Sequence, residues 1–170
     1  LAQGTIRYNP FASFIPEKAL RKHRHLTMDE LQKLMHTPVP NGFLCLVRDM
    51  FIFSTFTGIS YIDMCNLNTS NLSKDGKGNL WIKLKRQKTK SKCAIRLLDI
   101  PRRILEKYEG ERTGDRLFNM PCRSALTNNM PKLAKLCGIE RRLTYHCSRH
   151  SYIFLFTRNK KLTRNKLLDR

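Results

Sequence analysis

The sequence has few acidic residues for its length. Its 170 residues include 13 aspartates and glutamates against 33 lysines and arginines, which leaves a formal net charge of +20. With this imbalance the positive and negative charges of the protein cannot balance each other. Repulsion among the excess positive charges opposes a compact state unless a polyanion lies nearby. Nucleic acid is therefore the first partner to consider. The alternative is a basic protein without such a partner.

Long apolar runs, paired-cysteine motifs and a signal peptide are also absent. The apolar run that starts at Phe43 is interrupted by Arg48 and Asp49 and is too short to span a membrane. The six cysteines show no metal-ligand spacing, so we expect reduced thiols in a cytoplasmic protein, mostly filling its core. His23 and His25 allow a two-ligand metal contact, but their basic surroundings favour phosphate, and we expect no metal.

Helix signals follow one another from residue 27 onward. A capping-box pattern at Thr27–Glu30 predicts a helix that Pro38 and Pro40 end. The apolar segment over 43–56 predicts a central helix. Further signals predict a stop at Gly58, a capping-box start at Ser60–Asp63, a helix from Pro101 to about Tyr108 closed by Gly110, and a helix from about Ser124 to Cys137, kinked or restarted at Pro131 and ended by Gly138.

Two alternating segments predict a small antiparallel sheet of two or three strands. The residues that alternate along the first segment are Leu80, Ile82 and Leu84 with Trp81, Lys83 and Lys85. After a turn, Cys93, Ile95 and Leu97 alternate again. The connecting tip is crowded with five basic residues: Lys85, Arg86, Lys88, Lys90 and Lys92. This tip is either a solubilising edge that blocks strand pairing or a basic finger that reaches a phosphate backbone.

A histidine and an arginine stand three residues apart near the C-terminal end. If Thr144 caps a helix, His146 and Arg149 share one of its faces. An imidazole beside a guanidinium suits a phosphodiester, because it combines a proton carrier with a fork that neutralises negative charge. The alternative is a helix start with scattered polar residues.

The order of these motifs resembles the catalytic domain of the tyrosine recombinases, the phage-integrase family. The resemblance extends from about residue 9 to about residue 152. It rests on Asn9-Pro10-Phe11, Leu26-Thr27 with Glu30-Leu31, Phe56-Thr57-Gly58-Ile59 with Tyr61 and Asp63-Met64, Lys88-Thr89 in a hairpin, and His146 with Arg149-His150. It implies a mainly α fold with a small antiparallel β-sheet (α+β). It also implies a site-specific recombinase or integrase of mobile elements that works on duplex DNA with other recombinase subunits.

The resemblance implies a division of the chain into three parts. Residues 1–20 are expected to be the linker that enters from a missing core-binding domain. The catalytic domain is expected over 21–157, and 158–170 form a basic segment without a match in the family. Leu1 is not an initiator methionine, so we expect a fragment of a longer protein, truncated within the fold at its C-terminal end.

The family's chemistry assigns roles to several residues. A tyrosine forms a 3′-phosphotyrosyl bond to DNA, and no metal or cofactor is needed because the intermediate keeps the bond energy. Arg149 matches an arginine that binds the non-bridging oxygens of the phosphate in the transition state. His146 matches the acid/base residue, and Lys88 matches the lysine that protonates the leaving 5′ oxygen. His150 supports the site or packs beside it. The resemblance implies that the other cations of the tip bind phosphates of the DNA backbone: Lys85, Arg86, Lys90 and Lys92.

Two departures from the family pattern bear on activity. The family's first arginine falls on Ser60, which cannot carry the charge, and a nearby cation such as Arg86 is a candidate substitute. The Leu-Gly-His motif and nucleophilic tyrosine that follow Arg149 in the family have no match over 155–170. Tyr152 is too close to Arg149 in sequence and is expected in the core. The remaining tyrosines fit no better: Tyr8, Tyr61, Tyr108 and Tyr145.

We therefore expect no DNA cleavage by this chain alone. Either the chain is truncated, or its last residues were deleted or changed by a frame shift. A C-terminal segment supplied in trans by another subunit would restore function. A non-enzymatic basic DNA-binding module with the same fold is the alternative function. RNA binding is a weaker alternative, because the aromatic stacking motifs of RNA-binding modules are not found.

Overall fold

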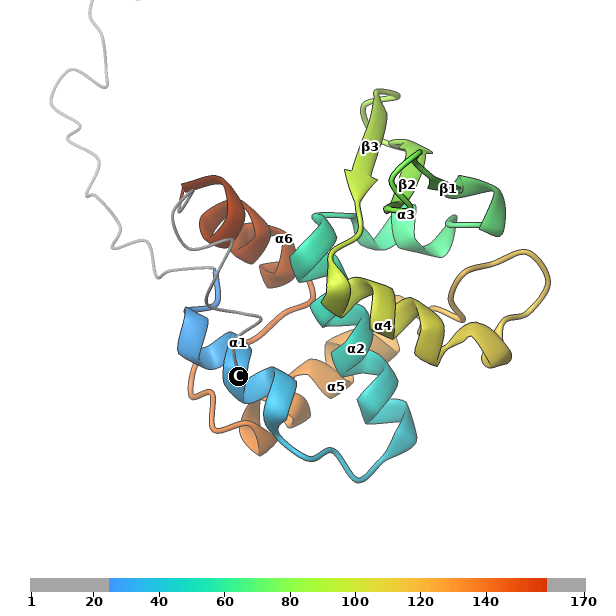
Figure 1. Cartoon of the computed structure of the whole chain (residues 1–170). Coiled ribbons are helices and arrows are strands. Elements are labelled where there is room, and N and C mark those ends of the chain that lie inside the picture. Colours follow the sequence, from blue (N-terminus) through green and yellow to red (C-terminus); the bar gives the residue numbers. More distant parts are fainter. Residues whose placement is uncertain (1–24, 159–170) are drawn as a thin grey trace, which may run out of the picture.

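The computed structural model describes residues 25–158. The expected linker over 1–20 and the basic segment after residue 158 lie outside the described residues. Helices form the body, and a three-stranded antiparallel sheet projects from one side of it (Figure 1). The mainly helical α+β fold expected from the sequence is confirmed. The elements are α1 (Met28–His36), α2 (Gly42–Thr57), α3 (Tyr61–Cys65), η1 (Thr69–Asn71), β1 (Leu72–Lys74), β2 (Leu80–Lys85), β3 (Lys92–Arg96), α4 (Asp99–Lys107), η2 (Glu109–Glu111), α5 (Arg123–Leu136), α6 (Cys147–Tyr152) and the π-helical η3 (Ile153–Arg158).

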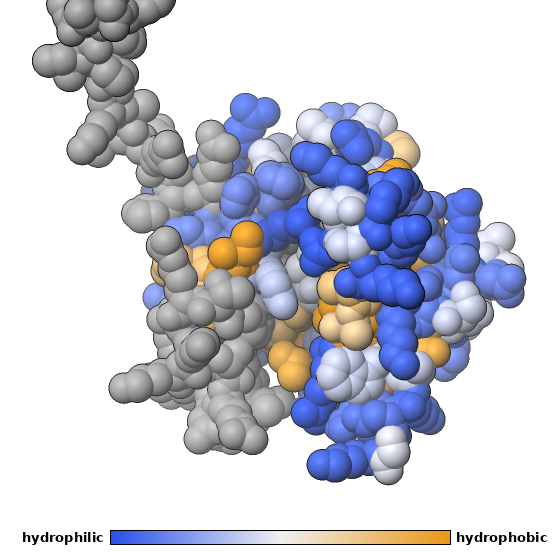
Figure 2. Space-filling view, turned by 90° about the horizontal axis from the view of Figure 1, so that it is seen from above, coloured by the Kyte–Doolittle hydropathy of each residue, from blue (hydrophilic) through white to orange (hydrophobic). Residues whose placement is uncertain are grey.

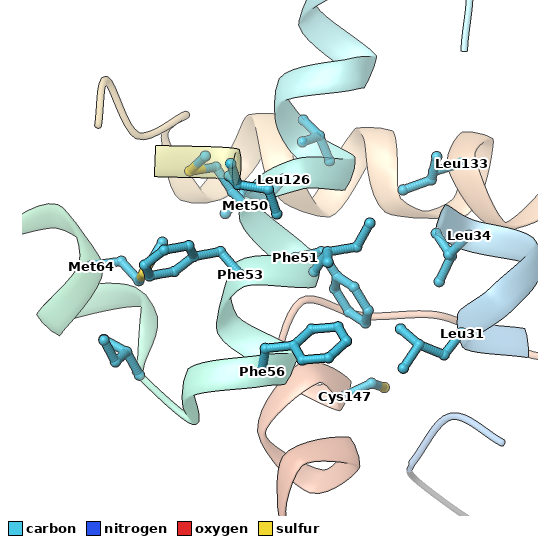
Figure 3. Close-up of a cluster of buried hydrophobic side chains, with 14 of the residues drawn as sticks. Leu31, Leu34, Met50, Phe51, Phe53, Phe56, Met64, Leu126, Leu133 and Cys147 are labelled. Carbon is cyan, nitrogen blue, oxygen red and sulfur yellow. The ribbon is translucent and has the colours of Figure 1, made fainter. Parts of the chain in front are cut away.

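The longest helix, α2, runs through the centre of the molecule and carries the core. It packs against α4, α5 and α6, and every residue from 49 to 57 is buried. Phe53 extends toward Met64 of α3, whereas Phe51 and Phe56 extend toward α1 on the other side (Figure 3). The ring of Phe53 meets that of Phe118 edge-to-face at 4.8 Å. An apolar helix at the centre of the domain is what the sequence predicted.

Gly58 ends α2 and brings α6 against it. Its φ of +66° is a left-handed conformation that favours glycine. A Cβ added there would lie only 2.6 Å from Cδ1 of Tyr152, so the tyrosine ring packs directly on the glycine backbone. Tyr152, expected in the core, is half-buried in this contact. The turn therefore fixes the end of α2 and the position of the C-terminal motif together.

We expect Gly58→Ala to lower the free energy of unfolding by about 2 kcal/mol or more, because it adds left-handed strain to a steric clash with Tyr152. Urea unfolding followed by circular dichroism measures this. Gly76→Ala is the matched control, since a Cβ there meets nothing within 4 Å. Equal stability losses in the two variants would contradict the role assigned to Gly58.

The capping box predicted at Thr27–Glu30 is confirmed, and it does more than begin α1. Glu30 accepts from the amide of Thr27, and the Thr27 hydroxyl accepts from the amide of Glu30. The same carboxylate receives a two-pronged contact from Arg141, with Nε at 2.7 Å and Nη2 at 2.8 Å. Burial raises the pKa of Glu30, but Arg141 and Thr27 together lower it below its usual value. Glu30 thus joins α1 to the segment before α6.

Glu30→Gln should lower the free energy of unfolding by about 1–2 kcal/mol at pH 7, because it removes a charged acceptor from Arg141. A carboxyl whose folded pKa is lowered stabilises the fold above its ordinary pKa, and that stabilisation is lost as the pH falls through the folded pKa. The difference between wild type and variant should therefore shrink below about pH 4. Urea unfolding across this pH range tests it, and a constant difference down to pH 2 would contradict it.

The sheet has the strand order β1-β2-β3 with antiparallel pairing throughout. Ile82, at its centre, is fully buried and faces both Leu72 and Ile95 across the ladder. Lys83 and Lys85, which alternate with the inward residues, are exposed. The alternation predicted from the sequence is therefore confirmed, and the basic side chains point away from the core.

Several predicted helix boundaries are wrong. Pro101 is the third residue of α4 rather than the first, and it still falls in the first turn, where amides lack helical partners. Gly110 lies within η2 and does not close α4, which ends at Lys107. Pro131 neither stops nor restarts α5, which is continuous because its apolar face is buried on both sides of the proline. The stop at Gly138 is confirmed by its φ of +63°.

The cysteines are less buried than predicted. All six are free thiols, and only Cys137 and Cys147 are buried, whereas Cys122 is exposed. The expectation that they mostly fill the core is therefore wrong. Within residues 25–158, none of the helices is both long enough and apolar enough to cross a membrane.

Candidate functional site

The histidine–arginine motif lies at the start of α6, but Thr144 does not cap that helix. The helix begins at Cys147 with His146 in the N-cap position, and the His146 side chain does not make the capping hydrogen bond to the first turn. Two tight turns precede it, in which the amides of Cys147 and Ser148 donate to the carbonyls of Thr144 and Tyr145 at 2.9 and 3.2 Å. The sequence prediction of a Thr144 cap is wrong, because α6 begins at Cys147 and the Thr144 hydroxyl lies 3.2 Å from Cys147 Sγ.

Small buried hydroxyls hold this motif against the body of the domain. Ser148 Oγ lies 2.8 Å from Ser54 Oγ of α2, and Ser151 Oγ accepts from the amide of Leu26 at 2.8 Å. Tyr145 donates its hydroxyl proton to the carbonyl of Met50 at 3.1 Å. The buried face of α6 is therefore fixed by hydrogen bonds as well as packing, which leaves His146 exposed and Arg149 half-buried on the other side.

A cavity of about 350 Å³ joins this motif to the starts of α3 and α5. His146 and Arg149 line it, and so does Ser60, the residue in the place of the family's first arginine. The structure thus brings together three of the predicted site residues. The other lining residues are Tyr61, Ile62, Arg123, Leu126, Thr127, Thr144, Tyr145 and Ser148.

Arg123, which sequence reasoning missed, is a second guanidinium on the wall of this cavity. It is the first residue of α5 and is exposed. Its Cζ lies 5.3 Å from the centre of the Tyr61 ring, a distance suited to a cation–π contact. Tyr61 in turn donates to the carbonyl of Pro121 at 3.1 Å. No local motif marks Arg123, because its position depends on the packing of α5 against the start of α3.

Ser60 and the basic hairpin are connected through one carboxylate. The Ser60 hydroxyl accepts from the Asp63 amide and donates to Asp63 Oδ2 at 2.6 Å. Asp63 Oδ1 accepts from the amide of Gln87 at 2.9 Å. The capping box predicted here is therefore only half formed, since the carboxylate binds the hairpin instead of the Ser60 amide. This bond anchors the residue before Lys88 beside the cavity.

The hairpin presents its lysines to solvent. Lys85, Lys88, Lys90 and Lys92 are exposed, and Lys85 faces Lys92 directly across the ladder. Like charges opposite each other destabilise a strand pair, so an anion near this tip would relieve their repulsion. Seen from above, on the face from which the sheet projects, the surface is mostly hydrophilic with small hydrophobic areas between (Figure 2). The tip therefore carries a cluster of exposed positive charges.

Lys88 and Arg86 flank Gln87, whose amide binds Asp63. Neither of them belongs to the lining of the cavity within the described part of the chain. Arg86 is half-buried, with Nη2 3.9 Å from Cys93 Sγ on the neighbouring strand. Lys88 is exposed in the turn that Asp63 anchors. His150 lies against His146, with ring centres 4.8 Å apart and planes nearly perpendicular.

Three of the described tyrosines have engaged hydroxyls. Tyr61 and Tyr145 donate to backbone carbonyls, and Tyr108 donates to Asp49 at 2.9 Å. Burial is the main cause that raises the pKa of each of these hydroxyls above its usual value. A hydroxyl that is harder to ionise and already donates a bond is a poor nucleophile.

Candidate metal ligands do not cluster within residues 25–158. No group of three or more histidine, cysteine, aspartate or glutamate side chains in this range could hold an ion. His25 stacks on the ring of Phe154 at 3.7 Å, and His23 lies outside the described residues. The ionisable groups that line the cavity include the guanidinium groups of Arg123 and Arg149 and the imidazole of His146.

Comparison with solved structures decides the fold. The chain superposes on the pre-cleavage complex of the XerH site-specific recombinase with its difH substrate, with a TM-score of 0.63 and 21% identity over 84% of this chain and 46% of that one. The chain has the tyrosine-recombinase catalytic-domain fold. The post-cleavage XerH complex with palindromic difH gives a TM-score of 0.65 at 20% identity, over 81% of this chain and 42% of that one. The crystal structure of XerA recombinase gives a TM-score of 0.63 at 20% identity, over 85% of this chain and 53% of that one.

This tyrosine-recombinase catalytic-domain fold accounts for about half the length of the recombinases it matches. The sequence itself has diverged further than the fold. No protein-family model matches it, and no curated protein sequence does. The resemblance read from short motifs is thus confirmed at the level of the fold.

Proposed function

We propose that this chain is the DNA-binding catalytic domain of a site-specific tyrosine recombinase or integrase of mobile elements, and that it does not cleave DNA alone. One observation carries the proposal: a single cavity is lined by His146, Arg149 and the Ser60 position, with the Lys88 hairpin anchored at its side through Asp63. Both matched XerH structures are complexes with a difH substrate, which supports duplex DNA as the partner of this chain.

The proposed roles follow from the geometry and charge of each group. Arg149 enters the cavity from a rigid helix start and can hold two non-bridging oxygens of a phosphodiester. The exposed imidazole of His146 can move a proton at an attacking or leaving oxygen. Lys88 sits on the anchored turn and can protonate the 5′ oxygen. The remaining tip cations, Lys85, Arg86, Lys90 and Lys92, would contact neighbouring phosphates and position the duplex.

The nucleophilic tyrosine is proposed to come from another subunit or from a segment that this chain does not carry. The engaged hydroxyls of Tyr61, Tyr108 and Tyr145 support that view. No cofactor is proposed, because strand exchange through a covalent phosphotyrosine conserves the bond energy. We further propose that 21–157 form the catalytic domain, that 1–20 link it to an upstream core-binding domain, and that 158–170 add a basic segment. The DNA on which the protein acts is proposed to be cytoplasmic.

A non-enzymatic DNA-binding module is the second candidate. The observations that favour it are the serine at position 60 and the hydrogen-bonded tyrosines, because both weaken a cleavage mechanism. The two candidates share DNA binding and differ in whether a supplied tyrosine restores strand cleavage.

Two assays test the proposed function. Fluorescence anisotropy with labelled duplex should show binding that weakens steeply between 50 and 200 mM salt, as expected for several phosphate contacts. Folded RNA of equal charge should compete less well. A suicide duplex substrate should give no covalent adduct with this chain alone, and an adduct would overturn the proposed lack of a nucleophile. Binding to folded RNA only would overturn the function itself.

A further inference from the structure

The cavity contains an unexpected pair of arginines. A phosphodiester transition state carries negative charge on two non-bridging oxygens, and one guanidinium does not neutralise both as well as two do. Ser60 provides a hydroxyl that is already committed to Asp63 at 2.6 Å, so it offers the site no charge. Arg149 is one cation on the wall, and Arg123 is the other.

We propose that Arg123 supplies the guanidinium that Ser60 cannot. This inference rests on the proposed function and names a binding residue for it. Arg123 stacks over Tyr61, the residue directly after Ser60, so its charge lies next to the position that lost one. The charge now comes from α5, while the original position lies at the start of α3.

The location of Arg123 is hard to explain by stability alone. It occupies the first position of α5, where the helix dipole disfavours a positive charge. The first turn of α5 has no acidic residue to offset it. Arg123 is exposed, and the structure gives it no ion pair within the described residues. An anion held in the cavity would turn this unfavourable placement into a favourable one.

Two contacts pre-position the side chain. Tyr61 provides the aromatic face below the guanidinium, and its own hydroxyl is tied to the carbonyl of Pro121, two residues before Arg123. The start of α3 and the start of α5 are thus joined through one tyrosine. Arg86, the substitute suggested by the sequence, is turned toward Cys93 on the sheet and does not line the cavity within the described residues.

The dinucleotide dTpdT, which carries one phosphodiester, is the probe for this site. NMR titration of the labelled chain measures its dissociation constant without a known target sequence. Arg123→Ala should weaken binding about tenfold or more, comparably to Arg149→Ala, because each loses a charge-assisted hydrogen bond. Arg123→Lys should recover only part of the affinity, since it keeps the charge without the fork. Lys135→Ala, an exposed change at the far end of α5, should bind like wild type.

A rescue variant separates binding from structure. Adding Ser60→Arg to Arg123→Ala should restore dTpdT affinity to within about threefold of wild type, because it returns a guanidinium to the position beside Tyr61. A merely structural role for Arg123 would not be rescued in this way. If Arg123→Ala binds like wild type while Arg149→Ala does not, the inference is overturned and the proposed function stands. If wild type itself shows no dTpdT binding at this cavity, both fall.

Discussion

Replacing Lys85, Lys88 and Lys90 together with alanine is expected to weaken binding to duplex DNA by about 10²-fold at 100 mM salt. All three side chains are exposed on one hairpin, where Lys85 faces Lys92 across the ladder. Within the described residues, neither of these two lysines has an ion pair with an acidic side chain, so their mutual repulsion is not offset in that way. Each lost phosphate contact should lower the slope of log K against log salt by about 0.9. The slope measured by anisotropy should therefore decrease in magnitude by two to three.

A charge-matched variant controls for the general loss of positive charge. Lys33, Arg103 and Lys135 are also exposed, and they lie on three helices outside the hairpin. Replacing these three with alanine removes the same net charge and should reduce affinity by less than about threefold, because distant charges are largely screened at this salt concentration. Equal losses in the two triple variants would show that the hairpin has no special part in binding.

Asp49→Ala is expected to lower the free energy of unfolding by about 2–4 kcal/mol. The Asp49 side chain is 6% exposed and joins α2 to α4, with Lys107 Nζ at 2.6 Å and Tyr108 OH at 2.9 Å. It also accepts from Arg48 Nε at 2.9 Å, and the Arg48 side chain is only 14% exposed. Removing the carboxylate leaves that buried cation without its charged partner, which is costly in a low-dielectric setting.

The pKa shifts around Asp49 agree with this role. Burial lowers the pKa of Lys107, but the hydrogen bond and charge of Asp49 raise it by more, so the net pKa lies above its usual value. Burial and Asp49 both raise the pKa of Tyr108. Tyr108→Phe is the matched control and should cost only about 1 kcal/mol, because it removes one neutral donor and keeps the ion pairs. Thermal and urea unfolding of both variants measure the difference. A loss for Asp49→Ala no larger than that for Tyr108→Phe would contradict the buried-cluster account.

Much of the fold could be predicted because its signals are local. The capping box at Thr27, the apolar continuity of α2 and the left-handed stops at Gly58 and Gly138 each depend on residues within one or two turns. The alternation over 80–85 specified the strand and its buried face in the same way. Such signals are strong enough to identify element types but not their first residues.

Tertiary contacts explain what the sequence could not predict. Asp63 was expected to complete a local capping box, but its carboxylate binds the amide of Gln87, which is 24 residues away. Arg123 enters the site only because Tyr61 and Pro121 bring α3 and α5 together. Ser60, His146 and Arg149, which lie in short motifs, line one cavity, whereas Arg123, which packing places there, was not predicted. The chain is only 20–21% identical to the matched structures, so contacts such as Asp63 with Gln87 and Arg123 with Tyr61 are also hard to infer from sequence similarity.

The central claim is that the hairpin and the start of α6 serve one phosphate, and amide shifts on adding dTpdT test it most directly. We expect the amides of Gln87 and Lys88 and those of His146 and Arg149 to shift together, with one shared dissociation constant, since Asp63 and Ser60 connect the two regions at the cavity. Shifts confined to one region, or two clearly different dissociation constants, would contradict the account.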